Sequence, residues 1–136
     1  MDYNWQNYTV LIVEDDEICY KYIELVLSRK TNINIIWAAT GKQAVDYCKL
    51  YDHIDIVLMD IQLPELNGYE ATRQIKSGKP DLPVIIQSAN ALNEELEKCI
   101  DAGCEAYVTK PIDISLLFQK IDSLLNNVPS NRIFIK

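Results

Sequence analysis

The segment from Ile54 to Asp60 constrains the fold of this chain more than any other. It is apolar apart from Asp55, it ends in a carboxylate, and Pro64 follows four residues later. Such a run predicts a strand buried on both faces, as in a parallel sheet, and the proline stops any continuation. Because open α/β sheets place ligand chemistry at the carboxyl ends of their strands, Asp60 is a candidate functional residue. A lone acid there is, however, more often an ordinary strand-to-loop residue.

Four further strands are predicted from apolar runs, at residues 8–13, 33–38, 82–87 and 106–109. Helical spacing of apolar residues predicts five helices between and after them. In the first helix we expect the apolar face to comprise Ile18, Tyr22, Leu25 and Val26, and in the fourth Leu92, Leu96, Cys99 and Ile100. Thr40 and Asn67 are expected to cap the second and third helices. Strands that alternate with helices indicate an α/β fold with a five-stranded parallel sheet covered on both faces.

Composition excludes several classes of function. With 136 residues, 49% of them hydrophobic and a net charge of −7, the chain is expected to be one globular domain without a nucleic-acid surface. No apolar run approaches membrane-spanning length and the start does not resemble a signal peptide, so we expect a cytoplasmic protein without membrane contact. The four cysteines lack paired metal spacing and are expected to be reduced structural thiols. A single histidine, His53, gives little support to a histidine-based metal site.

Polar residues follow four of the five predicted strands. Glu14 and Asp15 follow the first, Asp60 ends the third, Ser88 follows the fourth and Lys110 the fifth. Right-handed crossovers bring these positions to one edge of the sheet, where three carboxylates repel one another unless a cation lies among them. Mg²⁺ would suit such oxygen ligands, and the lysine and the hydroxyl could bind two oxygens of a phosphoryl group. The central aspartate would then be the nucleophile that forms an aspartyl-phosphate.

Each of these residues also has an ordinary interpretation. The acids after the first strand could favour a helix N-terminus through its dipole. Lys110 could be a solvated surface lysine, Ser88 could cap a turn, and Tyr107 could be half-buried strand packing. It is the convergence of Asp60 with the other strand ends that these separate interpretations leave unexplained.

Several motifs, in this order, resemble the receiver domain of two-component response regulators. They are Val13-Glu14-Asp15-Asp16-Glu17, Leu58-Met59-Asp60-Ile61-Gln62-Leu63-Pro64 with Asn67-Gly68, Ser88-Ala89, Ala102-Gly103, and Tyr107-Val108-Thr109-Lys110-Pro111. The resemblance covers residues 8–126, which leaves 1–7 as a lead-in segment and 127–136 as a tail. It implies a doubly wound, flavodoxin-like fold and a signalling role, with self-phosphorylation and autodephosphorylation as the only chemistry.

The resemblance also implies a role for each residue of the site. Asp60 would accept a phosphoryl group from a histidine kinase or a histidine phosphotransfer protein. Ser88 and Lys110 would bind the phosphoryl oxygens, and Lys110 would precede a cis bond to Pro111. Tyr107 would be a switch that turns inward after phosphorylation, and would thereby alter a face of the fourth helix, fifth strand and fifth helix for a homodimer or a downstream partner.

The metal site implied by the resemblance holds Mg²⁺, with Mn²⁺ as a substitute. Asp15 and Asp60 would bind it directly, Glu14 through a water, and Gln62 through its backbone carbonyl. Two other functions are possible for a nucleophilic aspartate or a fold of this kind. A haloacid-dehalogenase-type phosphatase would need an aspartate as general acid at the position of Gln62, and a partner-binding pseudo-receiver would lack part of the site. The sequence leaves open whether the domain stands alone or belongs to a hybrid sensor kinase.

Overall fold

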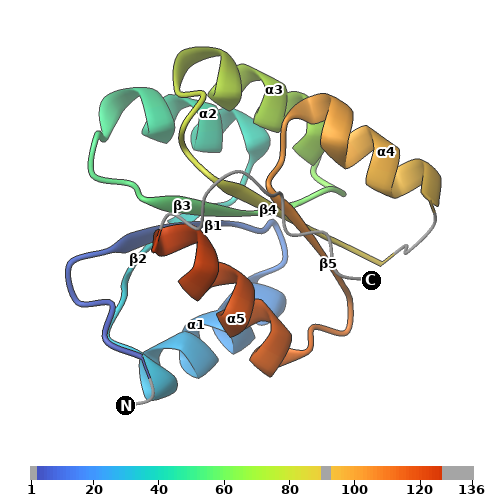
Figure 1. Ribbon diagram of the computed structural model, residues 1–136. Coiled ribbons are helices and arrows are strands. Elements are labelled where there is room, and N and C mark those ends of the chain that lie inside the picture. The colour runs from blue at the N-terminus through green and yellow to red at the C-terminus, as the bar shows by residue number, and fades with distance from the viewer. Residues whose placement is uncertain (1–2, 90–92, 127–136) are drawn as a thin grey trace.

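The computed structural model describes residues 3–89 and 93–126. Five parallel strands form one sheet in the order β2-β1-β3-β4-β5 (Figure 1). Their bounds are β1 Thr9–Val13, β2 Asn34–Ala38, β3 Ile56–Asp60, β4 Val84–Ser88 and β5 Ala106–Thr109. The chain winds outward in both directions from β1 and β3, which confirms the doubly wound α/β fold. The carboxyl ends of β1 and β3 are therefore neighbours at the switch point of the sheet, where such folds bind ligands.

Helices cover both faces of this sheet, as Figure 1 shows. On one face lie α1 (Glu17–Lys30) and α5 (Ile114–Leu125), and on the other α2 (Gly41–Leu50), α3 (Gly68–Gly78) and α4 (Asn93–Ala102). Every residue of β1, β3 and β4 is buried, which explains why these strands read as continuous apolar runs. None of the described helices could span a membrane.

The predicted apolar face of α1 is wrong for three of its four residues, and only Val26, which is partly buried, packs against the core. Ile18, Tyr22 and Leu25 are 81%, 53% and 49% exposed, while the inward face is formed by Tyr20, Ile23 and Leu27. The helix carries two apolar stripes at helical spacing, and only one of them can lie on the sheet. An exposed apolar patch therefore remains on α1, beside the carboxyl edge of the sheet.

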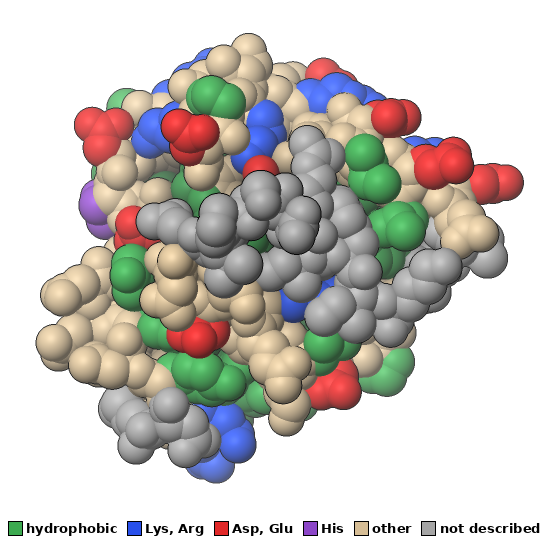
Figure 2. Space-filling view, viewed as in Figure 1, with side chains coloured by type: hydrophobic (Ala, Val, Ile, Leu, Met, Phe, Trp, Pro, Cys, Tyr) green, Lys and Arg blue, Asp and Glu red, His purple; other side chains and the backbone are tan. Residues whose placement is uncertain are grey.

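Helix α4 departs from the expectation in a similar way. Cys99 is buried and Leu96 is partly buried as predicted, but Ile100 is 42% exposed, and Leu92 lies outside the described residues. Four acids and one lysine occupy this ten-residue helix, and Figure 2 shows acidic side chains gathered over it. The outer surface of α4 is thus strongly acidic.

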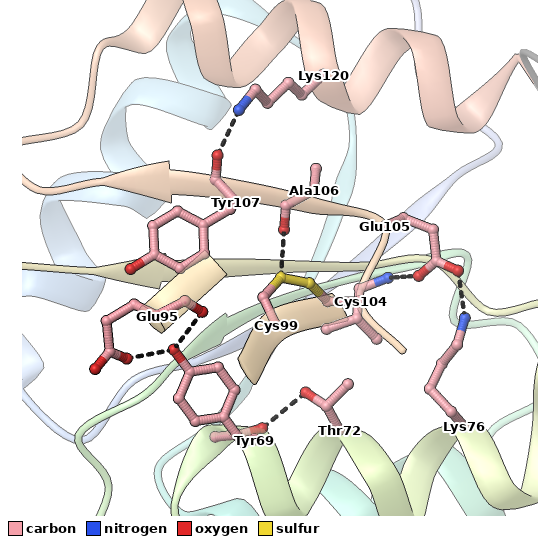
Figure 3. Close-up of a disulfide and its surroundings, with 12 residues drawn as sticks. Tyr69, Thr72, Lys76, Glu95, Cys99, Cys104, Glu105, Ala106, Tyr107 and Lys120 are labelled. Carbon is pink, nitrogen blue, oxygen red and sulfur yellow. Dashed lines mark hydrogen bonds and ion pairs between the residues drawn. A yellow bond between two sulfur atoms is a disulfide. The ribbon is translucent and has the colours of Figure 1, made fainter. Parts of the chain in front are cut away.

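Two of the four cysteines form a disulfide, which corrects the expectation of reduced thiols for this pair. Cys99, in the last turn of α4, is joined to Cys104, just before β5, with their Cα atoms 5.4 Å apart (Figure 3). Both residues are completely buried. Between them Gly103 has a φ of +92°, a left-handed conformation that suits glycine and ends the helix. The turn thereby brings the two cysteines together, whereas Cys19 and Cys48 are free thiols.

The predicted helix caps are confirmed. The Thr40 side chain accepts a hydrogen bond from the backbone amide of Gln43, and the Asn67 side chain accepts one from that of Glu70. Each cap satisfies an amide that the first helical turn leaves without a partner. The cap at Asn67 matters for the site, because it fixes the start of α3 directly after the loop that follows Asp60.

The segment before β1 packs against α5. Trp5 is only 3% exposed, its indole nitrogen donates to a carboxylate oxygen of Asp122 at 3.1 Å, and its ring contacts Tyr3 and Phe118. Tyr3 also pairs with Thr31 in an isolated bridge. These contacts make the lead-in segment part of the packed structure.

Candidate functional site

Three carboxylates meet at the carboxyl edge of the sheet, as the sequence predicted. Glu14 follows β1 directly, Asp15 comes next, and Asp60 is the last residue of β3. One carboxylate oxygen of each lies within 4.8 Å of those of the other two. Glu14 and Asp60 are 1% and 4% exposed, while Asp15 is open to solvent. We call this group of three carboxylates the acidic pocket, and its oxygen atoms fit a hard divalent cation.

Lys110 reaches the same place from the loop after β5. Its ammonium nitrogen is 3.2 Å from a carboxylate oxygen of Asp60 and 3.4 Å from one of Glu14. The backbone amide of Lys110 donates to the carbonyl of Ser88 at 2.8 Å, which anchors the loop to β4. The Lys110–Pro111 bond is cis, as predicted. Lys110 is therefore a cation of the site, not the solvated surface lysine that its sequence position alone allowed.

Burial and like charge perturb the pKa of Glu14. Burial raises the pKa of Glu14 to about 7, the nearby Asp60 carboxylate adds to the rise, and Lys110 opposes it. For Lys110, burial by itself would lower the pKa, but the carboxylates of Asp60 and Glu14 outweigh it and the pKa rises. The lysine is thus firmly protonated, while the Glu14 carboxyl is only partly ionised near pH 7. A cation entering the pocket would favour the ionised form of Glu14.

A close backbone contact holds α3 against the end of β3. A Cβ atom built on Gly68 would lie 2.2 Å from the backbone oxygen of Asp60 and 2.9 Å from the Cα of Ile61. The amide of Gly68 donates to the carbonyl of Ile61 at 3.0 Å. Only glycine permits this approach. In the sequence Gly68 belongs to a motif and to a helix start, and neither indicates this contact.

Ser88 and Tyr107 lie on the neighbouring strands β4 and β5, where Ser88 is opposite Thr109 and Tyr107 is opposite Ile86. Ser88 and Tyr107 are both buried, at 7% and 5% exposure. Burial raises the pKa of Tyr107, and a hydrogen bond with Ser88 partly opposes the rise. The ring of Tyr107 is therefore already turned inward, on the α4 side of the sheet (Figure 3). Gln62 is exposed in the loop two residues beyond Asp60.

Two contacts around Tyr107 were not predicted from the sequence. The Tyr69 hydroxyl on α3 donates to a carboxylate oxygen of Glu95 on α4 at 2.6 Å (Figure 3). On the opposite side of β5, the completely buried amine of Lys120 donates to the backbone carbonyl of Tyr107. Burial lowers the pKa of Lys120 to about 8. Lys120 lies at helical spacing within the apolar face of α5, a signal from which its burial could have been inferred.

The family model described as "Response regulator receiver domain" matches residues 10–122. Curated relatives include a cyclic di-GMP phosphodiesterase of Thermotoga maritima, 35% identical over 88% of this chain and 31% of the relative. The cell cycle response regulator CtrA of Brucella ovis is 34% identical over 85% of this chain and 49% of its own length. The chain thus spans between about a third and a half of these relatives, so their whole-protein activities belong to longer molecules.

Solved structures agree with the family. The receiver domain of a sensor histidine kinase from Pseudomonas aeruginosa, with magnesium in its active-site cleft, is 32% identical at a TM-score of 0.78, covering 88% of this chain and 98% of that one. A Saccharomyces cerevisiae receiver domain, crystallised with a histidine phosphotransfer protein, is 26% identical at a TM-score of 0.83, covering 93% and 94%. With a family model spanning most of its length, this chain belongs to the response regulator receiver domains of two-component signalling.

Proposed function

We propose that Asp60 accepts a phosphoryl group from a phosphohistidine of a histidine kinase or a histidine phosphotransfer protein, in a Mg²⁺-dependent reaction. The observation that carries this proposal is the convergence of Glu14, Asp15, Asp60 and Lys110 at one edge of the sheet. The chain would act as a signalling switch without a separate substrate, and its only chemistry would be its own phosphorylation and dephosphorylation. We place it in the cytoplasm.

The acidic pocket fits a magnesium ion by the chemistry of its donors. Asp15 and Asp60 would bind the metal directly, Glu14 would act through a water, and the backbone carbonyl of Gln62 would complete the protein ligands. The metal would supply positive charge that offsets the carboxylates and the phosphoryl oxygens. Mn²⁺ would substitute, because it accepts the same oxygen ligands. The magnesium reported for the Pseudomonas aeruginosa receiver domain supports this assignment.

The transfer itself needs positioning and charge neutralisation. A carboxylate oxygen of Asp60 attacks phosphorus as the bond from phosphorus to the histidine nitrogen breaks, and the imidazole leaves with its electron pair. The ammonium of Lys110, now 3.2 Å from Asp60, would move onto a phosphoryl oxygen. The hydroxyl of Ser88 would donate to a second oxygen. Burial of Asp60 strengthens both interactions because little water competes for the oxygens.

The exposed side of α1 is the surface over which a protein donor would approach. Ile18 and Tyr22 are exposed apolar side chains at the start of α1, next to the acidic pocket. Exposed apolar groups close to a reactive centre are typical of protein contact sites. The histidine phosphotransfer protein bound to the yeast receiver domain supports this class of partner. An aspartate in place of Ile18 should slow transfer from a phosphorylated protein donor but leave transfer from acetyl phosphate unchanged.

Phosphorylation would be transmitted through Ser88 to the face of α4, β5 and α5. Drawing Ser88 toward a phosphoryl group would alter its contact with Tyr107, and Tyr107 adjoins the Tyr69–Glu95 link that ties α3 to α4. We propose that the shifted face binds a downstream protein or a second copy of this chain. The acidic surface of α4 favours a partner with basic side chains over a contact of α4 with itself.

The decisive experiment measures phosphorylation by intact mass. Incubating the protein with Mg²⁺ and acetyl phosphate should add a single phosphoryl group, and Asp60→Asn should abolish it. Asp46→Asn, at an exposed acid of α2, is the matched control and should behave as wild type. Undiminished phosphorylation of Asp60→Asn, or an unmodified wild type under conditions that phosphorylate another receiver domain, would refute the proposal.

A further inference from the structure

An open pocket of about 430 Å³ lies between α1 and the loop that joins β5 to α5. Its wall is mainly apolar and includes Ile18, Tyr22, Ile23 and Ile112. We call it the α1 pocket. Its volume is in the range of small-molecule sites, which combine apolar walls with a few polar groups.

One polar group of the wall is not explained by the fold. Gln87 lies on β4 and lines the α1 pocket, and side chains alternate along a strand, so Gln87 points to the same face as the core residue Ile85. The Gln87 residue is completely buried. Neither its side-chain oxygen nor its side-chain nitrogen has a hydrogen-bond partner among the described residues.

A buried amide without partners is unfavourable for the free protein. The group loses its hydrogen bonds to water on folding and gains none in return. Packing alone does not require it, because Ile85 fills the equivalent position two residues earlier on the same face with an apolar side chain. Gln87 thus has the features of a residue that serves a ligand: it is polar, enclosed, and placed on the wall of a pocket that is otherwise largely apolar.

We propose that the α1 pocket binds a small, neutral and largely apolar molecule with an amide-like edge, whose donor and acceptor pair with the side chain of Gln87 when that buried amide turns into the pocket. The Gln87 amide offers two N–H donors and one carbonyl acceptor, so a carboxamide or lactam complements it. Glu14 and Lys110 also line the pocket but already contact each other at 3.4 Å, which favours a neutral ligand over an ion of either sign. Testing this proposal does not require phosphorylation of Asp60.

Benzamide is a suitable probe, because it joins an apolar ring to a carboxamide, and toluene is the control without the polar edge. In ¹H–¹⁵N spectra of the whole chain, benzamide should produce saturable shifts in the side-chain NH₂ signals of Gln87 and the backbone signals of Ile18 and Ile112. Gln87→Met keeps the side-chain length but removes the amide, and should weaken benzamide binding by about tenfold or more. Toluene should bind both proteins weakly and equally.

Three outcomes would overturn the proposal. Benzamide could give no saturable shift in the wild type, which is a result independent of how Gln87→Met folds. Benzamide could bind Gln87→Met as well as the wild type, so that the amide plays no part. Finally, the NH₂ protons of Gln87 could show contact with a long-lived water before the probe is added and keep it afterwards, which would make the residue a structural water ligand. None of these three outcomes involves phosphorylation. A failure here would therefore not count against the proposed phosphoryl transfer to Asp60, which is tested separately.

Discussion

The ammonium nitrogen of Lys110 lies 3.2 Å from a carboxylate oxygen of Asp60, although 50 positions separate the two residues in the chain. The contact exists because β5 and β3 end at the same edge of the sheet, on either side of β4. Lys110 also touches Glu14, so one cation is shared between two buried acids. Removing it would leave these acids facing each other in a poorly solvated pocket.

Replacing Lys110 with methionine should therefore impair both stability and phosphorylation. Methionine keeps much of the apolar stem but has no charge, so the phosphoryl oxygens lose a fixed cation. We expect the rate of phosphorylation by acetyl phosphate to fall by about 100-fold or more, the effect of removing one preorganised charged donor. Lys49→Met, at an exposed lysine of α2, is the control and should retain the wild-type rate. An equal rate in the two variants would contradict a role for Lys110.

The raised pKa of Glu14 predicts how stability depends on pH in the metal-free protein. Its pKa is about 7 in the folded state against 4.5 ordinarily, so the folded state binds the proton more tightly than the unfolded state. The stabilisation from this proton is complete below about pH 4.5 and is lost as the pH rises through about 7. Unfolding by urea across this range should show the decline, and Glu14→Gln should reduce it. If the free energy of unfolding instead rose between about pH 4.5 and 7 in the wild type but not in Glu14→Gln, the pKa of Glu14 would not be raised in the folded state.

The affinity for magnesium should depend on pH in the opposite sense to the stability of the metal-free protein. Binding favours ionised carboxylates, so the affinity for Mg²⁺ should increase with pH up to about 7, by at most tenfold per pH unit for one released proton. Thermal melting with and without Mg²⁺ at several pH values measures this linkage. A Tm unaffected by saturating Mg²⁺ at pH 8 would argue against the metal site.

The contact between Gly68 and the end of β3 predicts a large difference between two glycines of the same helix. Gly68→Ala would place a methyl group against the backbone of Asp60 and Ile61, and should lower the free energy of unfolding by about 3 kcal/mol. Gly78→Ala meets nothing within 4 Å, and should be neutral or raise stability by up to about 1 kcal/mol. Chemical denaturation of both variants tests the pair. Similar effects at the two positions would show that the close approach is not maintained in solution.

The buried position of Tyr107 predicts the path of the conformational response. A beryllofluoride adduct at Asp60 should shift NMR signals of Ser88, Tyr107 and α4, because the contact between Ser88 and Tyr107 would change. Tyr107→Phe keeps the ring but removes the hydroxyl, and should leave phosphorylation of Asp60 nearly intact while reducing the shifts in α4. Shifts confined to the loops of the acidic pocket in the wild type would refute this path.

The disulfide predicts a dependence on reductant. Closing a loop between Cys99 and Cys104 should stabilise the fold by about 2 kcal/mol, so dithiothreitol should lower the free energy of unfolding by that amount. The double variant with serine at both positions is the control and should not respond. Alkylation of the denatured protein without reductant should label only Cys19 and Cys48, and labelling of all four cysteines would contradict the bond.

The strands and the edge that carries the acids could be predicted because both follow from local patterns. Continuous apolar runs identify strands buried on two faces, and parallel strands necessarily share a carboxyl edge, so Glu14 and Asp60 had to meet. The inward face of α1 could not be predicted in this way. Its two apolar stripes have the same spacing, and only the tertiary arrangement decides that Ile23, and not Tyr22, lies on the sheet.

Other features depend on contacts between segments that the sequence does not relate. The proximity of Cys99 and Cys104 follows from where α4 ends and how Gly103 turns the chain, which spacing alone does not determine. The same is true of Gly68 against Asp60, and of the enclosure of Gln87 by α1 and the loop after β5. Each of these needs the assembled fold.

The packing of Trp5 and Tyr3 on α5 has a practical consequence for work with this protein. Tyr3 and Trp5 are held next to Thr31 and Asn32, which precede β2 and so lie at the amino edge of the sheet, opposite the acids. A fluorophore or affinity tag attached ahead of Tyr3 would be kept away from Asp60 and from an incoming protein donor. Deleting the residues before β1 would instead expose Phe118, and would make the protein less stable and more prone to aggregate.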